Sequence, residues 1–265
     1  MDRLRDASTL RASLVAWMRE QQERTAMDGF VFGLSGGVDS AVVCGLAAEA
    51  VGAEHCLGLI MPIESAEEDA RLAQEVAARF GVTAFRLDLD GPFGALLDSL
   101  ADFRERAERL LGRPAQPPDW RAATGDVLAR ANLKPRLRML SLYYYANLLR
   151  FLVVGTGNRD EFTVGYYTKW GDGAADLFPL GDLVKAEVWA LARDLGVPAD
   201  VVERAPTAGL WPGQTDEQEL GFPYALLDRY LLEGSSGDDL VDAAIRRREE
   251  TSRHKSAPPP VARPS

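Results

Sequence analysis

The segment SGGVDS, residues 35–40, holds the residue types best suited to chemistry. It follows a short apolar run and precedes an Ala/Val-rich stretch, which predicts a strand, a tight glycine turn and a helix. Gly36 and Gly37 allow backbone amides to turn toward one point, where the helix N-terminus adds positive charge, and both features suit a phosphate group. No Walker A pattern is present. Asp39 stands among these anion-binding groups, which favours a divalent cation joining its carboxylate to phosphate over a merely structural glycine turn.

A second polar segment, GTGNRDE at residues 155–161, also follows an apolar run. It begins like a dinucleotide fingerprint, but Asp160 replaces the third glycine, so no such fingerprint is assigned. Ligands of open α/β sheets collect beyond the carboxyl ends of the strands. We therefore expect Asp39 and Glu161 to converge on one metal ion, the alternative for Glu161 being a surface acid on a first helical turn.

Two long loops combine residues that suit neither a core nor a passive linker. Residues 165–176 contain three aromatic residues, a lysine and two acids, and residues 205–216 contain two prolines, two glycines and a tryptophan. Long ordered loops of this kind are usually functional, and the second is expected to act as a lid. Dimer contacts are the alternative. His254 and Lys255 lie beyond the predicted helices, in a basic stretch that would by default be a solvated tail.

These segments need secondary structure to position them. The hydrophobic pattern predicts strands and helices that alternate along the chain. Strands are expected at 29–34, 56–61, 82–89 and 151–154, and helices at 3–24, 41–51, 65–80, 134–150 and 186–195. Ser65 with Glu68 predicts a capping box, and Gly81 a left-handed stop. The alternation implies an α/β fold with parallel βαβ units.

The chain is expected to form one domain over residues 1–255. Residues 92–125 are interpreted as a helical insertion with a Pro-rich loop. The Pro-rich end, residues 256–265, is expected to be disordered.

Composition limits the classes of function. The 265 residues are 46% hydrophobic and carry 30 − 40 = −10 charges, which argues against broad binding to nucleic acid or to an anionic membrane. No apolar run approaches the ~18 residues of a membrane span, and no signal peptide is seen. Cys44 and Cys56 form no metal-binding pattern, which favours a reducing, cytoplasmic location.

Lysine is scarce, so the positions that keep it are informative. Only four of the thirty basic residues are Lys, namely Lys134, Lys169, Lys185 and Lys255. Lys presents a point charge that planar Arg does not reproduce. All four fall within or beside the segments discussed below.

The segments together resemble a known family. GLSGGVDSAVV is similar to the pyrophosphate-binding loop of N-type ATP pyrophosphatases, a superfamily of adenine nucleotide alpha-hydrolase-like proteins. NLKPRLRM, VGTGNRDEFTVGYYTKWGDGAADLFPLGDLVK, ERAPTAGLWPGQTDEQELG and the late HK resemble ammonia-dependent NAD synthetase. The resemblance covers most of the chain. It implies a Rossmann-like three-layer sandwich, in which helices flank a central parallel sheet, and a homodimeric ligase that converts deamido-NAD to NAD.

The resemblance also implies the reaction and its residues. The nicotinate carboxylate attacks the α-phosphorus of ATP and releases pyrophosphate, and ammonia then displaces AMP from the acyl-adenylate. Carried over by position, the ATP-binding residues are Gly33, Leu34, Ser35, Gly36, Gly37, Val38, Asp39, Ser40, Thr156, Lys185 and Thr207. Those for deamido-NAD are Arg136, Lys169, Asp176, His254 and Lys255. Asp39 and Glu161 would bind Mg²⁺, and Asp39, Lys185 and Asp172 are the catalytic candidates, with Asp172 helping to hold ammonia.

Alternatives follow from the same loop. Other SGGxDS ligases share it, but thiolating members need reactive cysteines and tRNA suits a charge of −10 poorly. A nucleotide-binding regulatory module without turnover is a second alternative, which the intact Asp39, Glu161 and Lys185 disfavour. Free ammonia is the expected nitrogen donor, and a separate amidase partner stays open as its source.

Overall fold

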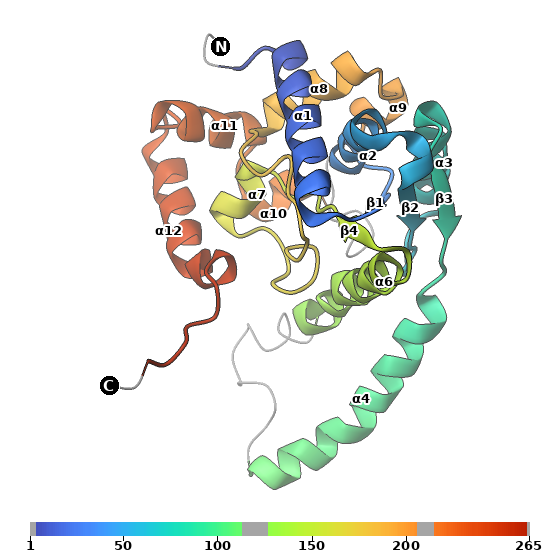
Figure 1. Ribbon diagram of the computed structural model, residues 1–265. Coiled ribbons are helices and arrows are strands. Elements are labelled where there is room, and N and C mark those ends of the chain that lie inside the picture. Colours follow the sequence, from blue (N-terminus) through green and yellow to red (C-terminus); the bar gives the residue numbers. More distant parts are fainter. Residues whose placement is uncertain (1–3, 113–126, 206–214, 264–265) are drawn as a thin grey trace.

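A four-stranded parallel sheet forms the centre of the computed structural model, which describes residues 4–112, 127–205 and 215–263. The strands are β1 (Gly29–Gly33), β2 (Cys56–Ile60), β3 (Thr83–Arg86) and β4 (Phe151–Val153). They lie in the order β3-β2-β1-β4, so β2 and β1 are the interior strands (Figure 1). Each strand was expected, although β3 is shorter than the predicted run.

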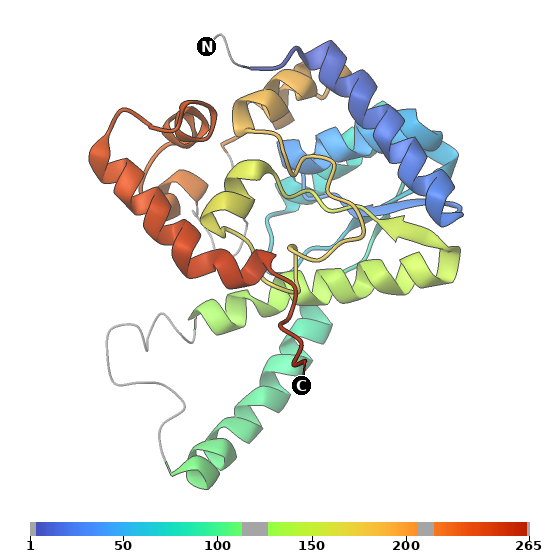
Figure 2. The same ribbon diagram turned by 60° about the vertical axis from the view of Figure 1, so that its left-hand side comes forward.

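Helices cover both faces of this sheet, as the three-layer prediction requires (Figure 2). On one face lie α1 (Ala7–Thr25), α2 (Val38–Val51), α3 (Glu67–Phe80) and α8 (Lys185–Leu195); on the other lie α4 (Asp90–Leu111) and α6 (Leu133–Leu149). The alternation of side chains along β1 explains both layers, since Phe30 and Phe32 enter the first core and Val31 enters the second. The Rossmann-like fold class is confirmed.

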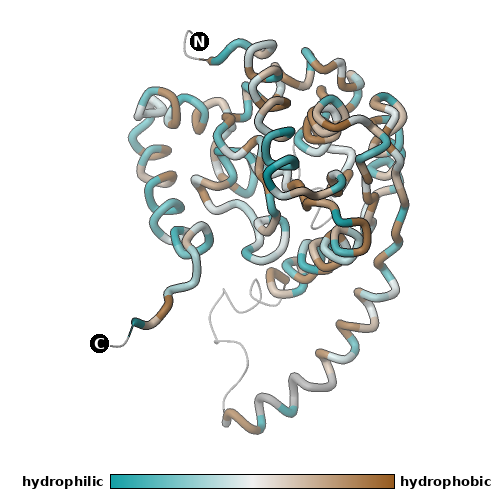
Figure 3. The backbone as a smooth tube through the Cα atoms, viewed as in Figure 1, coloured by the Kyte–Doolittle hydropathy of each residue, from teal (hydrophilic) through white to brown (hydrophobic). Residues whose placement is uncertain are grey.

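The predicted insertion contains a long helix. α4 runs away from the body of the molecule after its first turns, where Phe93 is buried in the second core (Figure 1). The part of this helix that Figure 3 draws in colour carries both hydrophobic (brown) and hydrophilic (teal) residues. The Pro-rich loop predicted at its end lies in 113–126, outside the described residues.

The C-terminal third builds a smaller layer of helices beside the sheet. It contains α7 (Arg159–Val164), α10 (Asp216–Leu220), α11 (Tyr224–Glu233) and α12 (Asp239–Ser256). The short α9 (Ala199–Val202) packs in the first core instead, and the 3₁₀ turn η1 (Ala53–His55) precedes β2. A separate apolar cluster around Tyr224 and Leu227 joins α7, α10, α11 and α12. His254 and Lys255 lie in the last turn of α12, so their expected place beyond the helices was wrong.

Helix ends test the finer sequence predictions. Gly81 has φ 69° and ends α3 in the left-handed conformation, as predicted. The capping box is absent, because α3 begins after Ala66 and the Ser65 hydroxyl instead accepts from the Ile63 amide at 3.2 Å. Within the described residues, no helix is both long and apolar enough to cross a membrane.

Candidate active site

A cavity of about 650 Å³ opens at the carboxyl edge of the sheet. Its size is typical of a small-molecule site. The segments after β1, β2 and β4 form its walls together with α6, α7 and the end of α12. Its polar and charged lining residues include Ser35, Asp39, Ser40, Ser65, Asp69, Asn132, Arg138, Thr156, Glu161, Thr168, Asp172, Arg204, Asp216, Glu219, Arg248 and Lys255.

The loop after β1 has the geometry of an anion-binding turn. Every residue of 33–40 except Gly36 lines the cavity. Gly36 has φ +77°, and a Cβ there would lie 2.5 Å from the backbone oxygen of Asp69, so only glycine fits. Gly37 caps α2 without a side-chain bond, which leaves amides of the first turn for a ligand.

Asp39 lies at the centre of the site, in the first turn of α2. Its Oδ2 accepts from Lys185 Nζ at 2.6 Å, and its Oδ1 accepts from Asn158 Nδ2 at 3.0 Å. Lys185 is 1% exposed. Burial would lower the pKa of Lys185, but the charges of Asp39 and Glu161 outweigh it and raise that pKa. The site therefore holds a charged lysine beneath the phosphate loop.

Glu161 is held by a capping box at the start of α7. Asn158 Oδ1 accepts from the Glu161 amide at 3.1 Å, and Glu161 Oε2 accepts from the Asn158 amide at 3.1 Å. Burial and then the charge of Asp39 raise the pKa of Glu161. Both residues line the cavity, and whether they share a metal ion stays a prediction.

The two acids could hold a magnesium ion only with help from a ligand. In the described part of the chain, no group of three or more His, Cys, Asp or Glu side chains is placed to bind a metal. Mg²⁺, however, is commonly bound by one or two carboxylates together with substrate phosphates and water. Asp39 and Glu161, two repelling carboxylates beside a phosphate loop, fit that donor set.

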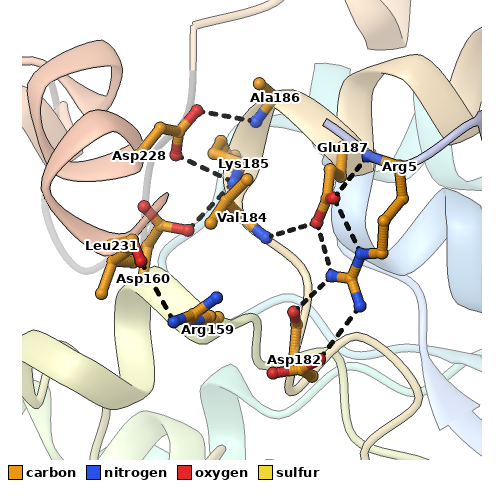
Figure 4. A network of polar contacts seen from close by, with 10 residues as sticks. All are labelled: Arg5, Arg159, Asp160, Asp182, Val184, Lys185, Ala186, Glu187, Asp228 and Leu231. Carbon is orange, nitrogen blue, oxygen red and sulfur yellow. Dashed lines mark hydrogen bonds and ion pairs between the residues drawn. The ribbon is translucent and has the colours of Figure 1, made fainter. Parts of the chain in front are cut away.

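A buried acid pair fixes the start of α8, which carries Lys185. The Lys185 amide donates to Asp160 Oδ2 at 2.9 Å and to Asp228 Oδ1 at 3.1 Å, and the Ala186 amide donates to Asp228 Oδ2 at 2.9 Å (Figure 4). Burial and then the charge of Asp228 raise the pKa of Asp160 to about 9. This shift favours a protonated carboxyl group in the pair, which relieves the repulsion between the two acids.

The loop predicted to bind substrate is joined to the C-terminal helix. Lys255 Nζ donates to the backbone oxygens of Gly165 and Tyr167 at 2.6 and 2.7 Å. Lys169 Nζ donates to the His254 oxygen at 2.6 Å. The end of α12 thus closes onto the loop, which sequence reasoning alone did not predict.

The remaining candidates for deamido-NAD lie around the cavity. Arg136 is exposed and donates from Nη2 to the Lys169 oxygen at 3.2 Å. Asp176 accepts from the Val153 amide at 2.8 Å and from Tyr143 Oη at 3.2 Å. Of the five candidates only Lys255 lines the cavity itself.

The other candidates are placed as follows. Thr156 and Asp172 line the cavity, and Asp172 Oδ1 accepts from the Thr168 amide at 2.9 Å. Lys185 lies behind the wall and reaches the cavity through Asp39. Thr207 lies outside the described residues, as does most of the predicted lid.

Some polar residues of the site had not been singled out from the sequence. Asn158 orients both Asp39 and Glu161, and the spacing of Asn158 and Glu161 is that of a capping box, so it could have been found. Asp216 is buried and accepts from Tyr166 and Tyr224 hydroxyls at 3.2 and 3.0 Å. No local pattern indicates this contact, because it joins three separate segments.

Fold and site together define a class. The chain is an α/β nucleotide-binding protein with a phosphate loop, and Asp39 and Glu161 lie beside that loop at the carboxyl edge of a parallel sheet. Residues 10–261 match the NAD synthase family. The chain belongs to this family.

Individual relatives agree with the family match. The NH(3)-dependent NAD(+) synthetase of Carboxydothermus hydrogenoformans is 46% identical over 94% of both chains, and that of Archaeoglobus fulgidus is 44% identical over 89% of this chain and 88% of its own. Among solved structures, the NMN synthetase of Francisella tularensis superposes with a TM-score of 0.85 at 32% identity, over 97% of this chain and 98% of its own.

Proposed function

We propose that this protein is a ligase that uses ATP and ammonia to convert deamido-NAD to NAD, with AMP and pyrophosphate as the other products. The observation that carries the proposal is the family match over residues 10–261 with a phosphate loop and the Asp39–Lys185 pair at one cavity. Ammonia cannot displace oxide from the nicotinate carboxylate, because oxide is too poor a leaving group. Adenylation of this carboxylate therefore comes first and makes AMP the leaving group. The amide bond then forms as ammonia attacks the acyl carbon.

The residues of the chain have separate tasks in adenylation. The amides and hydroxyls of 33–40 bind the β- and γ-phosphates, and Lys185 offsets the charge that grows on the departing pyrophosphate. Thr156 and Thr207 contact ATP. Asp39 and Glu161 would hold Mg²⁺, which would supply further neutralisation of phosphate charge. Asp172, next to Lys255 in the cavity wall, is assigned to hold ammonia for the second step.

The acid substrate is assigned to the joined loop and helix. Arg136, Lys169, His254 and Lys255 lie at the junction of this loop with α6 and α12, and Lys255 lines the cavity. Three cations and a histidine suit a dinucleotide with a pyrophosphate and a carboxylate. Asp176, which accepts from the Val153 amide and the Tyr143 hydroxyl, is assigned to the same substrate.

The working unit is proposed to be a homodimer that associates through α6. Leu140, Tyr144 and Leu148, four residues apart, are each 63% exposed and form one apolar stripe along this helix. Exposed stripes of this kind mark interaction sites, and a two-fold dimer buries the same stripe from both copies. Arg136 is on the same helix, so the partner copy would approach the deamido-NAD residues.

A second candidate substrate is nicotinic acid mononucleotide. The structural likeness to an NMN synthetase, with a TM-score of 0.85, favours it. Both reactions amidate a nicotinate carboxylate, and they differ in whether the substrate carries the AMP half. We propose a cytoplasmic location for either, in keeping with Cys44 and Cys56, which are buried free thiols.

One assay tests these proposals. The protein is incubated with ATP, Mg²⁺, ammonium and either deamido-NAD or the mononucleotide, and AMP and the amidated product are quantified. We expect AMP equimolar with NAD and at least 10-fold preference for deamido-NAD. Preference for the mononucleotide would transfer the assignment to NMN synthesis, and ATP binding without AMP release would indicate a regulatory module. A further arm with glutamine in place of ammonium, with and without an added amidase, tests the nitrogen source.

A further inference from the structure

Arg138 presents a guanidinium group to the cavity that no role described so far uses. It lies on α6, one helical turn after the start, and lines the cavity. Its Nε donates to the Met61 oxygen at 3.0 Å, and its Nη2 is 3.5 Å from the Ser65 hydroxyl. Both partners are neutral and belong to the segment after β2. They fix the direction of the side chain without neutralising its charge.

The charge of Arg138 has no bonded counter-ion among the residues that the structure describes. The carboxylates that attract it are Asp172 and Asp69, and neither forms an ion pair with it. Burial lowers the pKa of Arg138 despite these two acids, although a guanidinium stays charged at neutral pH. Charges withdrawn from water are normally paired. A guanidinium in a cavity wall that bonds only neutral groups therefore indicates an anion that arrives with a ligand.

The position of Arg138 identifies the part of the ligand. On one side, the Asp69 oxygen lies against Gly36 of the phosphate loop, so Ser65 and Asp69 belong to the ATP side. On the other side, Asp172 belongs to the loop assigned to the acid substrate. Arg138 stands between these two groups, where a carboxylate and an α-phosphate must meet for adenylation.

We propose that Arg138 is a catalytic residue that donates hydrogen bonds to the carboxylate and the α-phosphate as they join. This inference rests on the proposed function. In the step, a carboxylate oxygen forms a bond to the α-phosphorus, the bond from that phosphorus to the pyrophosphate oxygen breaks, and the electron pair leaves with pyrophosphate. Arg138 exchanges no proton. Two anions repel as they approach, and a planar guanidinium can bond an oxygen of each at once.

The test measures adenylation alone, as exchange of labelled pyrophosphate into ATP with deamido-NAD present and ammonia absent. Arg138→Gln is expected to slow this exchange at least 100-fold while the KM for ATP changes less than 3-fold. Arg138→Lys keeps the charge without the fork and should recover only part of the rate. Methylguanidine should accelerate Arg138→Ala at least 10-fold. Arg19→Gln is the matched control, since Arg19 also donates from Nε to a carbonyl, that of Ala50, at 3.0 Å but lies outside the cavity.

The outcomes separate this inference from the function on which it rests. No exchange by the wild-type protein would overturn the proposed function. Normal exchange by the wild type and by Arg138→Gln would overturn the role of Arg138 alone. Melting temperatures are measured for every variant, and a loss of exchange that follows a loss of fold, without rescue by Lys or methylguanidine, would return Arg138 to a structural role and overturn the proposal.

Discussion

At the scale of single residues, the bond between Asp39 and Lys185 ties stability to catalysis. Removing one member of a buried ion pair leaves the other unpaired, which typically costs about 3 kcal/mol or more. We expect Asp39→Asn to lose at least 100-fold in AMP release and roughly 3 kcal/mol in the free energy of unfolding, because Lys185 is 1% exposed. The double variant Asp39→Asn/Lys185→Met should regain part of that stability and none of the activity. Urea unfolding and the AMP assay measure the two effects. Normal turnover by the Asp39→Asn protein would exclude a catalytic role for Asp39.

The Asp160–Asp228 pair gives a dependence of stability on pH. The pKa of Asp160 is raised from 3.8 to about 9 by burial and by Asp228. Below about pH 4 both folded and unfolded chains hold this proton, so the group contributes nothing to the pH dependence; between that pH and 9 only the folded chain holds it, and stability falls as pH rises.

Asp160→Asn tests this effect, because the amide can donate to Asp228 and accept from the Lys185 amide without a titrating proton. We expect the variant to match the wild type near pH 4.5 and to exceed it by at least about 1.4 kcal/mol, the equivalent of one pKa unit, at pH 8. Unfolding is followed in EDTA at both pH values. Asp200→Asn, at a site 74% exposed, is the control. A constant difference between Asp160→Asn and wild type across this range would show that the pair does not share a proton.

At the scale of elements, the phosphate loop depends on the backbone of a single glycine. Gly36→Ala forces an L-residue to φ +77° and places its Cβ 2.5 Å from the Asp69 oxygen. We expect a loss of roughly 2 kcal/mol or more in stability and no rise in melting temperature when ATP is added. Gly94→Ala, in α4 with nothing within 4 Å, is the control and should be neutral or stabilising. ATP protection of Gly36→Ala equal to that of wild type would contradict a tight turn in the bound state.

The elements near the sheet were predictable because burial leaves a mark on their sequences. β1 and β2 are buried on both faces and are continuous short apolar runs, whereas α3 has one apolar face and repeats with the helical period. β3 is shorter than its apolar run because it lies at the edge of the sheet, with only β2 as a partner. The C-terminal helices were not predicted in detail. α12 has only Asp242 and Ile245 buried, so its core-facing pattern is sparse.

The candidate site divides in the same way. Asp39 and Glu161 could be inferred from local sequence because each follows a strand and begins a helix. The joining of Lys255 to Gly165 and Tyr167 spans about ninety positions, and its lysine carries no periodic pattern. The resemblance to a family assigned Lys255 to the substrate but did not indicate this contact. Its closed geometry required the fold.

At the scale of the whole molecule, the apolar stripe on α6 predicts the oligomeric state. Leu140→Glu and Leu148→Glu place charges where a two-fold interface would meet itself, so both should give monomers at micromolar concentration in light scattering. The KM for deamido-NAD should rise, since Arg136 is on the same helix. Leu240→Glu, at a leucine 84% exposed on α12, is the control and should leave the mass unchanged. A wild-type protein that is monomeric throughout would exclude the dimer.

The C-terminus connects the last helix of the molecule to the loop assigned to substrate. Lys169 and Lys255 donate to backbone oxygens across this junction, so the end of α12 is bonded to the loop. Removing residues 252–265 deletes His254 and Lys255 and frees the loop, which must then be ordered by substrate at about 1–2 kcal/mol per residue fixed. We therefore expect the KM for deamido-NAD to rise at least 10-fold, the KM for ATP to change little, and the dimer to persist.

The matched truncation removes residues 257–265, whose described part, 257–263, is exposed. It keeps Ser256, whose hydroxyl lies 2.9 Å from that of Tyr167. It should leave both Michaelis constants within about 2-fold of the wild type, because none of the contacts between α12 and the loop is lost. Steady-state kinetics give both Michaelis constants for the two truncated proteins. Equal constants for both truncations would mean that His254 and Lys255 stabilise the loop only in the free protein and make no contact with the dinucleotide.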